Sequence, residues 1–254
     1  MKVKQALLEN VTSGSSLDRI GHKENMAWVI DGADALTVNP ILDSPAQWLV
    51  DSFNNALTVN REKNLETSLE NALNTILSLS IGKKLATLSK AQQGCFTLAI
   101  ASLNLNQLSL RVIGDAHIVL MKTDNRIFHL TDDRISSFSE QTRMKKTSKE
   151  RYEQMLFNRS KMNTPSGYWV GSLSKDWPAQ MKSFKLPANQ CKRILLCSDG
   201  FYRAHTFGIT DWEDVLAEHK SLKAIFQDLR RFEIRKDINE VKQHDDVSAL
   251  LLAP

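Results

Sequence analysis

The chain has 254 residues, of which 42% are hydrophobic and 24% charged, with a formal net charge of +4. This composition can bury a substantial core, so we expect one domain over residues 1–254 and not a disordered chain. No apolar run approaches the roughly 20 residues that cross a bilayer, and the N-terminus lacks the apolar core of a signal peptide. The three cysteines form no C-x-x-C pattern. These features predict a cytoplasmic protein that is not a membrane protein, and the mild charge does not require a nucleic-acid surface.

Short apolar or alternating segments predict β-strands along the whole chain. The expected strands are residues 3–12, 26–30, 95–102, 108–113, 116–122, 126–130, 181–186, 193–197 and 247–252. Those between 95 and 130 follow one another through short connections, as antiparallel hairpins do.

Helices are expected between these strands. Ser44 is placed as an N-cap, with Pro45 at the first helical position and Gln47 at the capping-box position. Apolar residues then recur at helical spacing over 49–57 and 65–77, and helical patterns return at 139–160, 211–218 and 221–233. Strands at both ends and in the centre, with helices between them, predict an α+β fold.

Four aspartates lie beside short apolar runs in distant parts of the chain. Asp31, Asp115 and Asp199 each follow such a run, and Asp245 precedes the last one. An aspartate in this position is also an ordinary turn residue, so any one of these segments alone reads more often as a turn. If the runs are strands of one core, however, their ends bring the carboxylates together, and the four together predict a site for a hard cation.

The residues around these aspartates resemble the signature segments of the metal-dependent Ser/Thr protein phosphatases of type 2C. The segments are WVIDGAD at 28–34, GDAHIVL at 114–120, CSDGF at 197–201 and HDDVSAL at 244–250. Upstream, Lys23-Glu24-Asn25 resembles the acidic pair before the family's first core strand. The resemblance runs from about Asp18 to the C-terminus, and it implies a four-layer α-β-β-α sandwich of two mainly antiparallel sheets flanked by helices.

The resemblance implies a site for two Mn²⁺ or Mg²⁺ ions that activate a water molecule, and it leaves a third ion open. The implied ligands are Glu24, Asp31, the backbone carbonyl of Gly32, Asp115, Asp199 and Asp245. Asp31, which would bridge both ions, and Asp199 are the implied catalytic residues, and Arg19 is assigned to bind phosphate. Asp246 competes with Asp245, but adjacent residues in an extended chain point to opposite sides, so only one should reach the ions.

The sequence departs from the family pattern at several positions. The family's first motif usually reads Asp-Gly-x-Gly-Gly, whereas here Ala33, Asp34 and Ala35 follow the Asp-Gly pair, so a turn that glycine would favour must be made differently. Ala33 also stands where eukaryotic members carry a histidine that protonates the leaving group. Asn25 replaces an acidic residue beside Glu24. These departures leave open an inactive or weak pseudophosphatase that acts as a regulatory binding module. A phosphatase of small metabolites would share every ligand and is also left open.

The implied substrate is a phosphoserine or phosphothreonine protein, with a cognate Ser/Thr kinase as a further partner. The basic stretch 143–161 is interpreted as a solvated helix face, and a docking surface for a phosphorylated or acidic partner is the alternative. Residues 163–171 lie where related phosphatases carry a variable flap. In this segment we expect Tyr168 and Trp169 to be packing residues.

Overall fold

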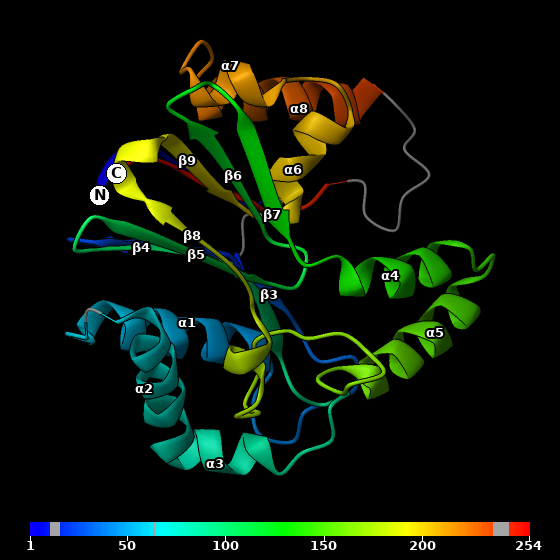
Figure 1. Cartoon of the computed structure of the whole chain (residues 1–254). Helices are drawn as coiled ribbons and strands as arrows, with labels where there is room; N and C mark the ends of the chain where they lie inside the picture. The colour runs from blue at the N-terminus through cyan, green and yellow to red at the C-terminus, as the bar shows by residue number, and fades with distance from the viewer. Residues whose placement is uncertain (11–15, 63, 236–243) are drawn as a thin grey trace.

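The computed structural model describes residues 1–10, 16–62, 64–235 and 244–254, and it shows four layers (Figure 1). Two five-stranded antiparallel sheets lie face to face. The first sheet has the order β2 (Arg19–Lys23), β3 (Met26–Ala33), β4 (Cys95–Asn104), β5 (Gln107–Ile113) and β8 (Lys182–Pro187). The second sheet has the order β1 (Lys2–Glu9), β10 (Val247–Ala253), β9 (Cys191–Cys197), β6 (His117–Lys122) and β7 (Ile127–Thr131).

Helices cover the outer face of each sheet (Figure 1). The first sheet is covered by α1 (Pro45–Val59), α2 (Leu65–Ser78) and α3 (Ser80–Ala86). The second sheet is covered by α6 (Asp199–Thr206), α7 (Trp212–Leu216) and α8 (Leu222–Arg235). Two further helices, α4 (Ser136–Arg143) and α5 (Ser148–Lys161), stand beside the layers at one end of the sandwich. The α+β class and the four-layer α-β-β-α sandwich are therefore confirmed.

Three apolar layers hold the sandwich together. Strand β3 lies between two of them, which explains why most of its residues are apolar. Successive side chains of a strand point to opposite faces of the sheet. Trp28 and Ile30 pack toward α1 and α2, whereas Ala27 and Val29 pack between the two sheets. A third cluster fills the space between the second sheet and helices α6 to α8. Both faces of the central strands are thus buried.

Most predicted strands and helices are present, with several informative differences. Strand β2 and helices α3 and α6 did not stand out in the sequence, because each is short. The predicted helix over 139–160 is two helices, since Thr147 and Glu150 form a capping box that starts α5. Asp31 lies within β3, which continues to Ala33, and not just beyond its end. The end of the predicted strand 3–12 lies outside the described residues.

No helix in the described ranges is long and apolar enough to cross a membrane.

The packing between α1 and the first sheet centres on three aromatic side chains. Phe96 lies with its ring centroid 4.8 Å from that of Phe53 and 5.5 Å from that of Trp177, and all three are fully buried. We expect Phe96→Ala to lower the free energy of unfolding by about 3–5 kcal/mol, because it leaves a cavity among rigid neighbours. Urea denaturation measures this, with Val38→Ala as a control at a residue that is 88% exposed. Equal losses in the two variants would contradict this packing.

Candidate active site

At one end of the sandwich, the ends of strands from both sheets lie close together. At this end Cys197, the last residue of β9, pairs with His117 at the start of β6 and with Ala249 near the start of β10. In the first sheet, Asp31 near the end of β3 pairs with Thr97 near the start of β4. The segments just beyond these ends carry the acidic residues, so chain topology brings Asp31, Asp115, Asp199 and Asp245 together, as predicted from the sequence.

Asp18 is a fifth member of this cluster, and the sequence reasoning missed it. Its side chain is only 1% exposed. It shares a hydrogen bond with Asp31, and its Oδ2 accepts a 2.5 Å hydrogen bond from Ser248 Oγ. The available signal was its place directly before the short segment 19–23, which forms β2. Without β2, the sequence pattern points to Glu24, close before β3, and not to Asp18, directly before β2.

The expectation that Glu24 belongs to this site is wrong. Lys23 pairs with Met26, so Glu24 lies in the tight turn between β2 and β3. Asp31 lies five residues beyond Met26, which places it roughly 16 Å along the strand from that turn. The carbonyl of Glu24 accepts a 3.0 Å hydrogen bond from the N-terminal amine, at the opposite end of the sandwich from the aspartates.

The residues that depart from the family pattern have structural roles. Asn25 is not beside the carboxylates, and its amide donates a 2.9 Å hydrogen bond to the carbonyl of Leu103. Asp34 accepts hydrogen bonds from Ser44 Oγ at 2.7 Å and from the backbone N–H of Ala46 at 3.1 Å, and thereby helps to cap α1. The backbone after Asp31 is extended and pairs with β4, so no glycine-dependent turn is needed there.

Burial and mutual repulsion raise the pKa values of three of the clustered carboxyl groups, those of Asp18, Asp31 and Asp115. Burial is the largest cause for Asp31, whose pKa lies well above its usual range, and repulsion from the four other aspartates adds to it. The pKa of Asp18 rises to about 7 through burial, offset in part by its hydrogen bond from Ser248. The pKa of Asp115 also rises to about 7, through burial and then the charge of Asp199. A cation at this site would relieve both effects.

The chemistry of the site fits a hard divalent cation. Its donors are carboxylate oxygens, which suit Mg²⁺ and Mn²⁺ better than zinc. Thr97 lies opposite Asp31, and its Oγ1 is buried with no hydrogen-bond partner among the described residues, as expected where a ligand or its water is missing. In the part of the chain that the structure describes, no three His, Cys, Asp or Glu side chains form a ready-made set of ligands.

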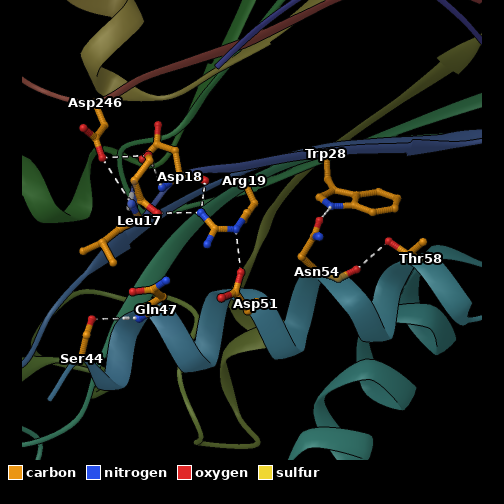
Figure 2. A network of polar contacts seen from close by, with 11 residues as sticks. Leu17, Asp18, Arg19, Trp28, Ser44, Gln47, Asp51, Asn54, Thr58 and Asp246 are labelled. Carbon is orange, nitrogen blue, oxygen red and sulfur yellow. Dashed lines mark hydrogen bonds and ion pairs between the residues drawn. The ribbon is translucent and has the colours of Figure 1, made fainter. Parts of the chain in front are cut away.

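Arg19, the predicted phosphate ligand, fastens the segment that carries Asp18 to α1 (Figure 2). Its Nε donates a 2.6 Å hydrogen bond to Asp51 on α1, and the two groups form an ion pair. Its Nη1 donates 2.6 Å hydrogen bonds to the carbonyls of Ser16 and Asp18. Among the described residues, these contacts leave Nη2 for a phosphate oxygen, so the structure gives Arg19 a positioning role, and phosphate binding stays a prediction.

The adjacent carboxylates of Asp245 and Asp246 have different neighbours. Asp246 accepts hydrogen bonds from Ser16 Oγ at 2.8 Å and from the backbone N–H of Leu17 at 3.3 Å (Figure 2). Asp245 acts electrostatically on Asp31 within the cluster. Gly200 permits this arrangement, because a Cβ there would lie 1.9 Å from the carbonyl oxygen of Asp246. Asp245 thus remains the better candidate ligand.

A buried ion cluster fixes the segment that carries Asp245. Glu233 on α8 is fully buried and accepts hydrogen bonds from Arg230 at 2.5 Å and from His244 Nδ1 at 2.9 Å. Arg203 on α6 lies 3.1 Å from the same carboxylate. Arg230 also donates a hydrogen bond to the backbone carbonyl of Asp245. The cluster, here called the Glu233 clamp, joins α6 and α8 to the last segment before β10.

The aspartates open into a cavity of about 660 Å³. Asp115, Asp199 and Asp245 line it, β6, β7 and α6 form one wall, and α4 and α5 form the other. On the first wall, the rings of His117 and Tyr202 stack with centroids 3.7 Å apart. The carboxylates are therefore reachable from solvent, apart from the enclosed Asp18.

Residues of the basic stretch 143–161 and of the flap segment 163–171 are exposed to solvent or packed within the fold. Lys146 and Lys149 are exposed, as the solvated-face interpretation expects. Arg159 is 6% exposed and donates 2.9 Å hydrogen bonds to the carbonyls of Gln93 and Asp34. Tyr168 and Trp169 are 6% and 8% exposed and belong to packed apolar clusters, which confirms their packing role.

Comparison with known proteins gives a family and a set of similar folds. The sequence profile of the protein phosphatase 2C family matches residues 17–242. No curated protein matches the chain in sequence.

Three solved structures illustrate the likeness in fold. The Ser/Thr phosphatase Stp1 from Staphylococcus aureus has a TM-score of 0.59 at 12% identity, with 100% of this chain and 96% of that chain covered. PppA from Pseudomonas aeruginosa has a TM-score of 0.58 at 13% identity, with 97% and 95% covered. The catalytic domain of PstP, solved in complex with two manganese ions, has a TM-score of 0.54 at 14% identity, with 97% and 95% covered.

The raised pKa values predict how the metal-free protein responds to pH. Asp18 and Asp115 have folded-state pKa values of about 7, above the value of about 3.9 for an unfolded aspartate. Their favourable contribution is therefore complete below about pH 4 and is lost as the pH rises through about 7. In EDTA, we expect the melting temperature to fall between pH 5 and pH 8, and to fall less in Asp18→Asn.

Adding Mn²⁺ or Mg²⁺ at pH 8 should restore the melting temperature, because the ion binds only the folded protein. Thermal denaturation monitored by circular dichroism measures both effects. A metal-free protein that gains stability from pH 5 to pH 8 would contradict the carboxylate cluster.

Because the Glu233 clamp positions Asp245, a change in the clamp should weaken metal binding although Glu233 is not itself a proposed ligand. Glu233→Gln should weaken Mn²⁺ binding by about 10- to 100-fold, because the segment that positions Asp245 loses a charged anchor. Isothermal titration calorimetry measures this, with Glu213→Gln, at an exposed position on α7, as the matched control. Unchanged affinity in a folded Glu233→Gln protein would show that the clamp serves stability alone.

Proposed function

Because the chain belongs to the protein phosphatase 2C family and is a metal-dependent phosphoprotein phosphatase, we propose that Mn²⁺ or Mg²⁺ is its cofactor. The observation that carries this proposal is the convergence of five aspartates at one end of the two sheets, with raised pKa values at Asp18, Asp31 and Asp115 and a cavity above them. Two ions are proposed, with a third left open. The two manganese ions in the similar PstP structure support this number.

The structure supports a revised set of ligands. We propose Asp31 as the central ligand, because its carboxyl group interacts with every other aspartate of the cluster. Asp199 and Asp245 complete one side, and Asp115 with Asp199 serves an additional ion. On the remaining side, Asp18 takes the place that the sequence had given to Glu24, next to the carbonyl of Gly32. Gly32 is confined there, since a Cβ would lie 2.9 Å from the carbonyl oxygen of residue 17.

Divalent ions bound at such a site supply a hydroxide from water at neutral pH and neutralise charge on the phosphoryl oxygens. The protein's own residues hold the carboxylates in place and keep the phosphate ester in line with them. Ala33, where a histidine could have protonated the leaving group, is exposed at the end of β3, so solvent can provide that proton. No side-chain nucleophile is required.

We propose a phosphoserine or phosphothreonine protein as the substrate and a cognate Ser/Thr kinase as a further partner. Residues 1–254 are proposed to act as one catalytic unit. A cytoplasmic location is also proposed, since Cys95, Cys191 and Cys197 are all free and buried, as suits a reducing compartment. The pseudophosphatase alternative loses its two sequence arguments, because Asn25 lies away from the site and Asp34 caps α1.

The decisive experiment is hydrolysis of p-nitrophenyl phosphate and a phosphothreonine peptide with Mn²⁺, Mg²⁺ or EDTA. We expect metal-dependent turnover that falls more than about 100-fold in Asp31→Asn and Asp199→Asn, since loss of a direct ligand should exceed the 10- to 100-fold effect of an outer partner. Asp18→Asn should also lose activity, whereas Glu24→Gln should retain it. A folded protein without turnover in any metal would overturn the proposal, and a severe loss in Glu24→Gln would contradict the revised ligand set.

A further inference from the structure

The cavity that holds the aspartates continues into an apolar arm between α4, α5 and the segment after β3. The arm is lined by Leu36, Ile135, Phe138, Met155 and Tyr168. We propose that this apolar arm binds a hydrophobic side chain of the phosphoprotein substrate, adjacent in sequence to the phosphorylated residue. This inference rests on the proposed function, because it assigns a specificity subsite to the same active site.

The arm offers apolar surface that the protein core does not use. Leu36 and Met155 are half-buried, and among the described residues they join none of the packed apolar clusters. Phe138 and Ile135 pack against the cluster that contains Tyr168, and the rings of Phe138 and Tyr168 lie 5.2 Å apart. The arm therefore has a fixed back wall and two side chains available for contact.

Two of the polar side chains that line the cavity beside the arm, Asn158 and Arg159, already have partners. The Asn158 amide donates hydrogen bonds to the carbonyl of Phe138 at 2.8 Å and to Thr142 Oγ1 at 2.9 Å. The guanidinium of Arg159 is bound to the carbonyls of Gln93 and Asp34. These two side chains therefore offer little to a polar substrate side chain, whereas an apolar side chain would gain from burial against the arm.

The size of the cavity indicates that more than the phosphorylated side chain is bound. A volume of about 660 Å³ lies within the range of pockets that enclose drug-sized ligands. The carboxylates occupy one part of this space, so a phosphoryl group placed at them leaves the arm free. A residue next to the phosphorylated one is the part of a peptide substrate that can reach it, since consecutive Cα atoms are only about 3.8 Å apart.

The arm is also fixed relative to the carboxylates. Tyr152 on α5 donates a 3.0 Å hydrogen bond from its hydroxyl to the carbonyl of Leu36, and Arg159 on the same helix holds the carbonyl of Asp34. Both anchor points follow Asp31 closely in the chain. The spacing between the arm and the site of phosphate hydrolysis is therefore set before the substrate binds, which favours discrimination between sequences.

The test compares phosphothreonine peptides of equal length and charge that carry leucine or serine directly before or after the phosphothreonine. We expect kcat/KM to be about 10- to 100-fold higher for leucine on one side, from burial of a whole side chain, with the difference mainly in KM. Met155→Glu should abolish this preference. Phe157→Glu, on the same helix but 52% exposed and outside the cavity, should keep it.

Turnover of p-nitrophenyl phosphate separates this inference from the proposed function, because that compound has no amino-acid residue next to its phosphorylated group. The unmodified protein and Phe157→Glu should hydrolyse it equally well. Normal turnover of this compound with equal kcat/KM for the leucine and serine peptides would overturn the apolar arm and leave the phosphatase intact. A preference that survives Met155→Glu would place the subsite elsewhere, and no metal-dependent turnover of any substrate would overturn both proposals.

Discussion

Electrostatic repulsion among buried carboxylates is the constraint on which this structure depends. Five aspartates are held at one end of the sandwich, where burial and mutual repulsion disfavour the charged forms of Asp18, Asp31 and Asp115. Without a cation, the raised pKa values show that this arrangement costs stability at neutral pH. The same repulsion creates a strong preference for a bound cation. Affinity for metal and instability without it are therefore two consequences of one arrangement.

Several parts of the fold hold these charges in place against that repulsion. Ser248 on β10 binds Asp18, and the backbone N–H of Ser198 donates to the carbonyl of Ser248, which fastens the end of β9 to the same strand. The Glu233 clamp and Arg19 anchor the two irregular segments that have no strand pairing of their own. Each contact joins segments that are far apart in the sequence. The site is thus as rigid as the packing of both sheets and their helices.

Helices α4 and α5 stand outside the four layers and complete the cavity rather than the core. Their attachment runs through buried polar contacts such as those of Arg159, one of the few residues in the basic stretch that does not face solvent. Asp34 contributes both to this attachment, through its carbonyl, and to the cap of α1, through its side chain. Asp34, one of the residues that depart from the family pattern, therefore links α5, which lines the cavity, to α1, which covers the first sheet.

The sequence by itself determined the α+β class, the start of α1 at Ser44 and four of the five clustered aspartates, because apolar periodicity and capping are local signals. Tertiary structure alone decided between Glu24 and Asp18. That choice depends on the pairing of the short strand β2 with β3, which sends one acidic residue to the turn and brings the other to Asp31. Strand register and the packing of one sheet on another are set by contacts between distant segments, and no local pattern in the sequence encodes them.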